Sequence, residues 1–165
     1  RSCMMLMKCF KGMKKLLLGR IFSDKKVDFL LVNAVYFQAV DMTGGYKASD
    51  YSCHLELDIS ADKNDYGYEV GSWVPYLSIS FSITKDGAPV DSGTFMPMAA
   101  SDGPHYGNNV HMGEDGTYNV EFTIKYPEGD EYLIHTDNTG PKSSTFPSTA
   151  TFSTEWNYKF GSWAE

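Results

Sequence analysis

Apolar and polar side chains alternate with a period of two along most of the chain after residue 26. The pattern is clearest over residues 118–124, where Tyr, Val, Phe and Ile are separated by Asn, Glu and Thr. Such alternation predicts β-strands with one buried face, because successive side chains of a strand point to opposite sides of the sheet. Seven predicted strands occupy residues 27–38, 54–59, 77–83, 92–98, 108–112, 118–124 and 151–160. We therefore expect an all-β protein.

Turn residues separate these strands, for example Lys85-Asp-Gly and Pro127-Glu-Gly-Asp. Seven short alternating strands in about 135 residues are typical of an immunoglobulin-like antiparallel β-sandwich. The stretch 138–149, rich in Ser, Thr and Pro, is predicted to be a loop before the last strand. Within that strand, Phe152, Trp156, Tyr158 and Phe160 are expected to share the buried face. The chain therefore predicts one domain over residues 27–165.

The net charge of −7 conceals a sharp division along the chain. Residues 1–26 carry eight Lys and Arg and one acid, so residues 27–165 hold six bases and twenty acids. A body this acidic argues against nucleic acid as a partner, because phosphate binding requires clustered Lys and Arg. An acidic surface instead favours the attraction of cations.

The basic segment at residues 1–26 begins like a secretory signal, with positive charge before an apolar run. The run Leu16–Leu18 is interrupted by Gly19-Arg20, whereas a signal peptide needs an apolar stretch of roughly 7–15 residues. We expect residues 1–26 to be a leader that is either disordered or a degenerate signal. The three cysteines are odd in number and lack zinc-finger spacing, so no disulfide framework is expected.

Candidate metal chemistry is concentrated in residues 95–107. Met98, Asp102 and His105 lie within eight residues, and Gly103-Pro104 predicts a sharp turn between them. A thioether beside an imidazole suits copper, and a nearby carboxylate suits a harder ion such as iron or manganese. Asp102 has two readings, since it either braces its own turn or takes part in metal binding. Met96 fits a core methionine better than a ligand.

Period two places a second pair of candidate ligands, His54 and Glu56, side by side on one face of a strand, with Asp58 next along that face. Cys53 points the opposite way and is expected to be a buried apolar thiol. His135 stands in a loop beside Asp137 and is either a ligand or an ordinary surface residue. His111 has no acidic neighbour within its strand and is predicted to lie on the surface.

Several segments resemble the periplasmic iron-transport protein family, a bacterial group of dimeric, immunoglobulin-like, copper-binding proteins. Its members accompany a high-affinity iron permease of the inner membrane and include a treponemal membrane antigen. The resemblance covers about residues 32–163 and is carried by VYFQ (35–38), CHLELDI (53–59), WVPYLSISF (73–81), TFMPMAASDGPHYGNNV (94–110) and IHTD (134–137).

This resemblance implies copper ligands at His54, Met98, His105 and His135, with Glu56 and Asp102 holding iron beside them. It implies copper as cofactor, Fe2+ or Fe3+ as cargo, and manganese or zinc as substitutes in vitro. It also implies a homodimer, in the periplasm or anchored to a membrane facing it, although the export signal in this chain is incomplete. Strand-face aromatics such as Tyr36, Trp73 and Tyr76 either line the subunit interface or complete one core.

The expected function is capture of iron and its delivery to an inner-membrane iron permease. Two alternatives remain open at this point. One is a copper-dependent iron redox enzyme, a ferroxidase or ferric reductase; the other is a sandwich protein that binds a host glycoprotein. No catalytic residue is assigned, because the sequence has no recognisable Ser/His/Asp order and no phosphate-binding loop.

Overall fold

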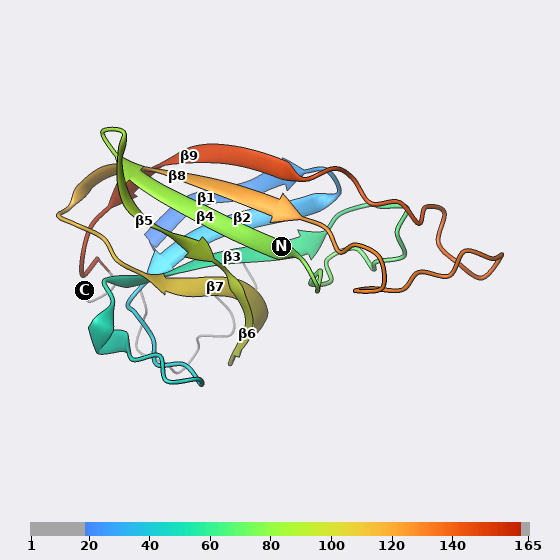
Figure 1. Ribbon diagram of the computed structural model, residues 1–165, viewed down its shortest axis with the longest axis horizontal. Coiled ribbons are helices and arrows are strands. Elements are labelled where there is room, and N and C mark those ends of the chain that lie inside the picture. The colour runs from blue at the N-terminus through green and yellow to red at the C-terminus, as the bar shows by residue number, and fades with distance from the viewer. Residues whose placement is uncertain (1–18, 163–165) are drawn as a thin grey trace.

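Two antiparallel sheets packed face to face form the described part of the chain, residues 19–162 of the computed structural model. The strands are β1 (Gly19–Val27), β2 (Leu30–Phe37), β3 (Cys53–Ala61), β4 (Ser78–Lys85), β5 (Ala88–Thr94), β6 (Met96–Ala100), β7 (Gly103–Val110), β8 (Gly116–Lys125) and β9 (Ala150–Tyr158). One short 3-10 helix, Ala48–Asp50, lies between β2 and β3. The immunoglobulin-like β-sandwich predicted from the alternation is confirmed (Figure 1).

The first sheet has the order β1-β2-β3-β7-β6, and its edge strand β1 begins earlier than the sequence predicted. Residues 19–26, assigned to the leader, pair with β2 instead, and Phe22 packs against Phe122 and Phe152 of the other sheet at 6.3 and 5.9 Å between ring centroids. Two register irregularities interrupt this strand, which explains why its alternation was not apparent. The remainder of the predicted leader, residues 1–18, lies outside the described residues.

The second sheet has the order β5-β4-β8-β9, and the chain passes between the sheets at Phe95. The segment 92–98 was predicted as one strand, but it is split between β5 of the second sheet and β6 of the first. Phe95 is buried at this crossing, and its backbone N–H donates to the carbonyl of Ile79 at 2.8 Å. This crossing and the separate β1 bring the described strands to nine rather than seven.

The core lies between the two sheets and is filled by the inward-facing side chains that the alternation predicted. Trp156 and Tyr158 of β9 are buried there. Phe160 was predicted to share their buried face, but this is wrong: the strand ends at Tyr158, and Phe160 is 64% exposed. Tyr36 also belongs to the core. Cys53 is fully buried as predicted, and burial raises the pKa of its thiol.

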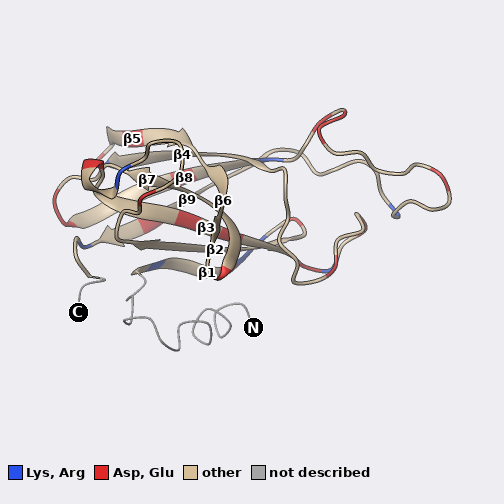
Figure 2. Ribbon diagram, turned by 90° about the horizontal axis from the view of Figure 1, so that it is seen from below, with Lys and Arg blue, Asp and Glu red and all other residues tan. Residues whose placement is uncertain are grey.

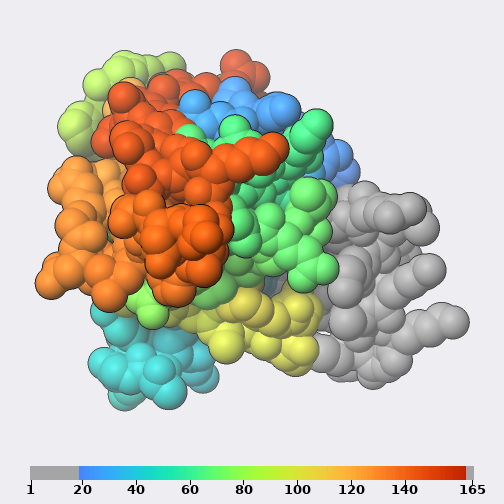
Figure 3. Space-filling view, turned by 90° about the vertical axis from the view of Figure 1, so that its right-hand side faces the viewer, coloured from blue at the N-terminus to red at the C-terminus, as the bar shows by residue number. Residues whose placement is uncertain are grey.

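The segment between β8 and β9 contains no strand and extends beyond one end of the sandwich (orange in Figure 1). The predicted loop 138–149 is part of it. Figure 3 shows the segment between β8 and β9, in orange and red-orange, over part of this end of the molecule. Acidic positions are distributed widely over the domain (red in Figure 2). In the part of the chain that the structure describes, no helix has the length and apolar character needed to cross a membrane.

Candidate metal centre

The strand register brings four of the six predicted ligands together on the outer face of the first sheet. In the antiparallel pairs, Glu56 of β3 lies opposite Gly107 of β7, and His105 of β7 lies opposite Met98 of β6. Directly opposed residues point to the same side of a sheet, and so do residues two apart on one strand. His54, Glu56, His105 and Met98 therefore share one face, although they come from three strands.

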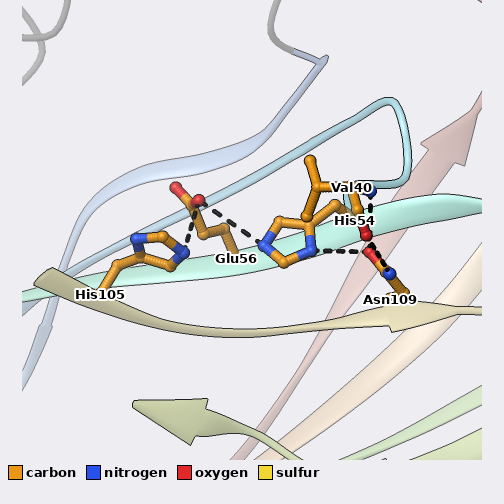
Figure 4. A network of polar contacts seen from close by, with 5 residues as sticks. All are labelled: Val40, His54, Glu56, His105 and Asn109. Atoms are coloured by element: carbon orange, nitrogen blue, oxygen red, sulfur yellow. Dashed lines mark hydrogen bonds and ion pairs between the residues drawn. The ribbon is translucent and has the colours of Figure 1, made fainter. Parts of the chain in front are cut away.

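Three of these side chains form a compact buried cluster (Figure 4). His54, Glu56 and His105 are only 1%, 5% and 5% exposed, and one ligand atom from each lies within 4.8 Å of the others. Glu56 Oε1 is 2.9 Å from His105 Nε2 and 3.8 Å from His54 Nε2. The shorter contact lacks hydrogen-bond alignment, so His105 Nε2 is buried without a well-directed partner. Such an arrangement fits atoms that face a shared ion.

The two imidazoles have different electrostatic surroundings. Burial lowers the pKa of His54, against the opposing effects of the Asn109 hydrogen bond and the Glu56 charge. Burial also acts to lower the pKa of His105, but the adjacent Glu56 carboxylate, with Asp58 and Asp102, outweighs it and raises the pKa. The cluster thus contains one imidazole held neutral and one that associates with a carboxylate.

Glu56 carries a charge into a buried position, and its ion-pair partners among the described residues are the two histidines. A buried carboxylate is costly unless a cation or several hydrogen bonds compensate it. A metal ion bound to Glu56, His54 and His105 would supply that compensation. The donor set therefore fits a metal cation.

Met98 and Asp102 lie at the margin of this cluster. Met98 is half-buried and directly opposite His105, so its thioether is on the ligand face. Asp102 is exposed in the turn between β6 and β7, and its charge contributes to raising the pKa of both His105 and Asp58. Met96 was predicted to be a core methionine, but this is wrong: it is partly exposed and shares the outer face with Met98.

His135 is placed elsewhere in the single chain. It lies exposed in the loop between β8 and β9, where its Nδ1 is 2.9 Å from Thr139 Oγ1. The metal-ligand cluster found among residues 19–162 does not include it. Its assignment as a ligand stays a prediction. His111 is exposed and stacks on Tyr51 at 4.9 Å, as expected of a surface residue.

Three further residues belong to the site but were not assigned to it from the sequence. Asp58 follows Glu56 on the same face; its buried Oδ2 lacks a hydrogen-bond partner among the described residues, and burial with the Glu56 charge raises its pKa to about 7. Gly107 leaves space for the cluster, since a Cβ there would lie 2.9 Å from His54 Nε2. Asn109 contacts His54 Nδ1 at 2.9 Å. Their alternation with His105 along β7 and Glu56 along β3 was the available signal.

Comparison with known proteins gives a consistent result. The family model described as Fe2+ transport protein matches residues 19–161. The 34 kDa membrane antigen of Treponema pallidum is 43% identical over 134 residues, which cover 76% of this chain and 66% of the antigen. The chain thus spans slightly less than two thirds of that relative's length.

Two solved structures share the fold over nearly their whole length. The copper-reconstituted P19 protein from Campylobacter jejuni has a TM-score of 0.79 and 33% identity, covering 87% of this chain and 97% of P19. FetP from uropathogenic Escherichia coli strain F11, expressed recombinantly in the periplasm, has a TM-score of 0.77 and 36% identity, covering 89% of this chain and 97% of FetP.

Proposed function

This chain belongs to the Fe2+ transport protein family. We propose that it is a periplasmic protein that captures iron beside a copper site. The protein then delivers the iron to an inner-membrane permease. One observation carries the proposal: two imidazoles and a carboxylate are buried together with ligand atoms within 4.8 Å of one another. Copper in the similar P19 structure supports copper as the resident metal.

His54 Nε2, His105 Nε2 and the Met98 thioether are the groups that would hold copper. Imidazole suits copper in both common oxidation states, and a thioether favours Cu(I). Bound copper would supply the capacity to exchange one electron with iron. The protein's own contribution is a buried pair of imidazoles on the central strand β3 and its neighbour β7.

Carboxylates on the same face would hold iron. Glu56 Oε1 lies 3.8 Å from His54 Nε2 and 2.9 Å from His105 Nε2. The charge of Asp102, in the exposed turn, contributes to raising the pKa of His105. Carboxylate oxygen suits iron better than it suits copper in its lower oxidation state. The acidic body, with twenty acids against six bases after residue 26, would raise the local concentration of cations.

We also propose a homodimer in which His135 of one copy completes the site of the other. The support is that His135 is exposed on a loop extending beyond the sandwich and stands apart from the cluster of its own chain. Tyr76 and Leu133, 60% and 78% exposed, offer apolar contact area near that loop. Tyr36, in contrast, is buried in the core and so is unsuitable as an interface residue.

Elemental analysis of the protein purified from a periplasm tests the metal assignment. We expect copper to be retained and to give an absorption spectrum that changes when His54 and His105 are both replaced by alanine. The matched control is His111→Ala, whose ring lies on Tyr51 away from the cluster. Loss of the spectrum in the control alone, or no retained metal in the native protein, contradicts the proposal.

The direct opposition of Met98 and His105 beside Glu56 also suits a redox role, because it places soft and hard donors side by side. A ferroxidase or ferric reductase is therefore the second candidate function. Repeated turnover of iron oxidation state by substoichiometric copper-loaded protein would establish it. A single stoichiometric electron transfer would leave iron capture as the function.

A further inference from the structure

Asn109 is a buried polar residue of β7 whose side chain connects the candidate metal centre to the segment after β2. It is 3% exposed and lies opposite His54 in the strand pairing. Its amide makes contacts to His54 and to both backbone groups of Val40, as Figure 4 shows. These contacts bear on which nitrogen of the neutral His54 ring carries the hydrogen.

The Val40 backbone fixes the orientation of the Asn109 amide. The Val40 N–H donates to Asn109 Oδ1 at 3.2 Å, and Asn109 Nδ2 donates to the Val40 carbonyl at 2.7 Å. A backbone N–H can only donate and a backbone carbonyl can only accept, so the reversed amide would oppose like groups at both contacts. The oxygen of the amide is therefore the atom that faces His54.

That oxygen determines the tautomer of His54. Asn109 Oδ1 is 2.9 Å from His54 Nδ1 and can only accept, so Nδ1 must carry the hydrogen. A neutral imidazole has one N–H, which leaves Nε2 with its lone pair free. Nε2 is also the nitrogen that faces the Glu56 carboxylate, at 3.8 Å.

We propose that Asn109 is a positioning residue that holds His54 in the Nδ1–H tautomer and thereby prepares Nε2 to bind metal. The proposal rests on the metal-binding function proposed above. It assigns Val40 an indirect part, since its backbone orients the amide. Partners of this kind on a ligand histidine typically contribute about 10- to 100-fold in metal affinity.

Long-range 1H–15N NMR of the metal-free protein tests the tautomer directly, with the His54 signals assigned by their loss in His54→Ala. We expect the native protein to show protonated Nδ1 and unprotonated Nε2. An Nε2–H tautomer in the native protein would overturn the proposal. The measurement needs no metal, so its result is independent of whether the native protein binds copper.

Two substitutions separate the acceptor from the link to Val40. Asn109→Leu removes the acceptor, and we expect loss of the single tautomer and copper binding about 10- to 100-fold weaker. Asn109→Asp keeps an acceptor oxygen but loses the amide N–H that donates to the Val40 carbonyl. We expect it to retain the Nδ1–H tautomer and to bind copper at least tenfold more tightly than the Leu variant.

The control is Asn108→Leu, because Asn108 is the adjacent residue of β7 and its amide donates to the Thr94 carbonyl instead. We expect it to bind copper like the native protein. Thermal unfolding establishes that each variant is folded before its affinity is compared. Equal copper affinities in Asn109→Leu and the native protein would overturn the proposal, and so would an Asp variant as weak as the Leu variant.

Discussion

Met98 lies directly opposite His105 in the pairing of β6 with β7. The pairing places a thioether and an imidazole on one face, and that face also carries the buried Glu56 of the neighbouring strand. The short turn between β6 and β7 therefore serves to align two ligands of different chemical character.

Removing either member of this pair should weaken copper binding. We expect His105→Ala and Met98→Ala each to reduce copper affinity at least tenfold, which corresponds to about 1.4 kcal/mol. His111→Ala should have almost no effect, because this exposed ring is stacked on Tyr51. Competition titration with a copper chelator measures all three. A His111 variant as impaired as the other two would show that the ligands are misassigned.

Glu56→Gln should separate hard cations from copper. The substitution keeps the shape of the side chain but removes the charge that lies 2.9 Å from His105 Nε2. Manganese binding should fall at least tenfold, whereas copper binding should persist, because imidazole and thioether donors remain. Calorimetry with each metal measures the difference. Equal losses for copper and manganese would mean that the two functions are inseparable at this residue.

Gly107→Ala should block the site without unfolding the protein. The new methyl carbon would lie 2.9 Å from both His54 Nε2 and the Leu55 carbonyl, so it would occupy the space in front of the ligand nitrogen. We expect copper affinity to fall at least tenfold and stability to fall by about 1–3 kcal/mol.

Gly93→Ala is the control for this change. Gly93 is also a strand glycine, but the nearest atoms to its added Cβ belong to the Phe81 ring, at 3.3 Å, away from the cluster. Copper titration and thermal melts should show native copper binding in the control. Unaltered copper binding in a folded Gly107→Ala protein would argue against an ion at His54 Nε2.

Asp58 should make the metal-free protein less stable as the pH rises. Burial raises the pKa of Asp58 from 3.8 to about 7, so the folded protein binds this proton more tightly than the unfolded chain does. The resulting stabilisation is fully present below pH 3.8 and is lost as the pH rises to about 7. Asp58→Asn mimics the protonated carboxyl and should raise stability at pH 8 by up to about 4 kcal/mol, with little effect at pH 3.5.

Denaturant unfolding of the metal-free protein at these two pH values provides the measurement. Asp137→Asn is a control of opposite sign, because hydrogen bonds from Thr139 lower the pKa of this exposed carboxyl. Its replacement should bring no gain in stability as the pH rises. A stability difference for Asp58→Asn that is the same at both pH values would contradict the assigned shift.

The protein should be a dimer in solution. Light scattering at micromolar concentration should return about twice the chain mass of 18.4 kDa. Leu133→Asp would place a charge in the exposed apolar surface of the protruding loop and should shift the mass toward the monomer. A monomer mass for the native, metal-loaded protein would exclude the shared site.

Much of the fold could be predicted from the sequence because most strands bury one face. β8 alternates without interruption and was located closely, whereas β1 escaped prediction because its register irregularities break the period. The division at Phe95 was also missed, because an apolar ring at a crossing between sheets looks like one more strand position.

The candidate site shows the same division between local and non-local information. His54 and Glu56 could be paired from period two alone, and Met98 with His105 from their shared turn. The roles of Gly107 and Asn109 depend on which residues of β3 they face, and a strand register between distant segments is invisible in one sequence.

β3 buries both of its faces, with Leu55 and Leu57 toward the core and His54 and Glu56 toward the ligands. A slip of one residue would exchange the two sets, forcing charge into the apolar interior and expelling the leucines. The burial of the leucines during folding therefore also fixes the side of the sheet on which the metal ligands lie. A chain that has reached its native core has already set the order of its ligands, before any ion arrives.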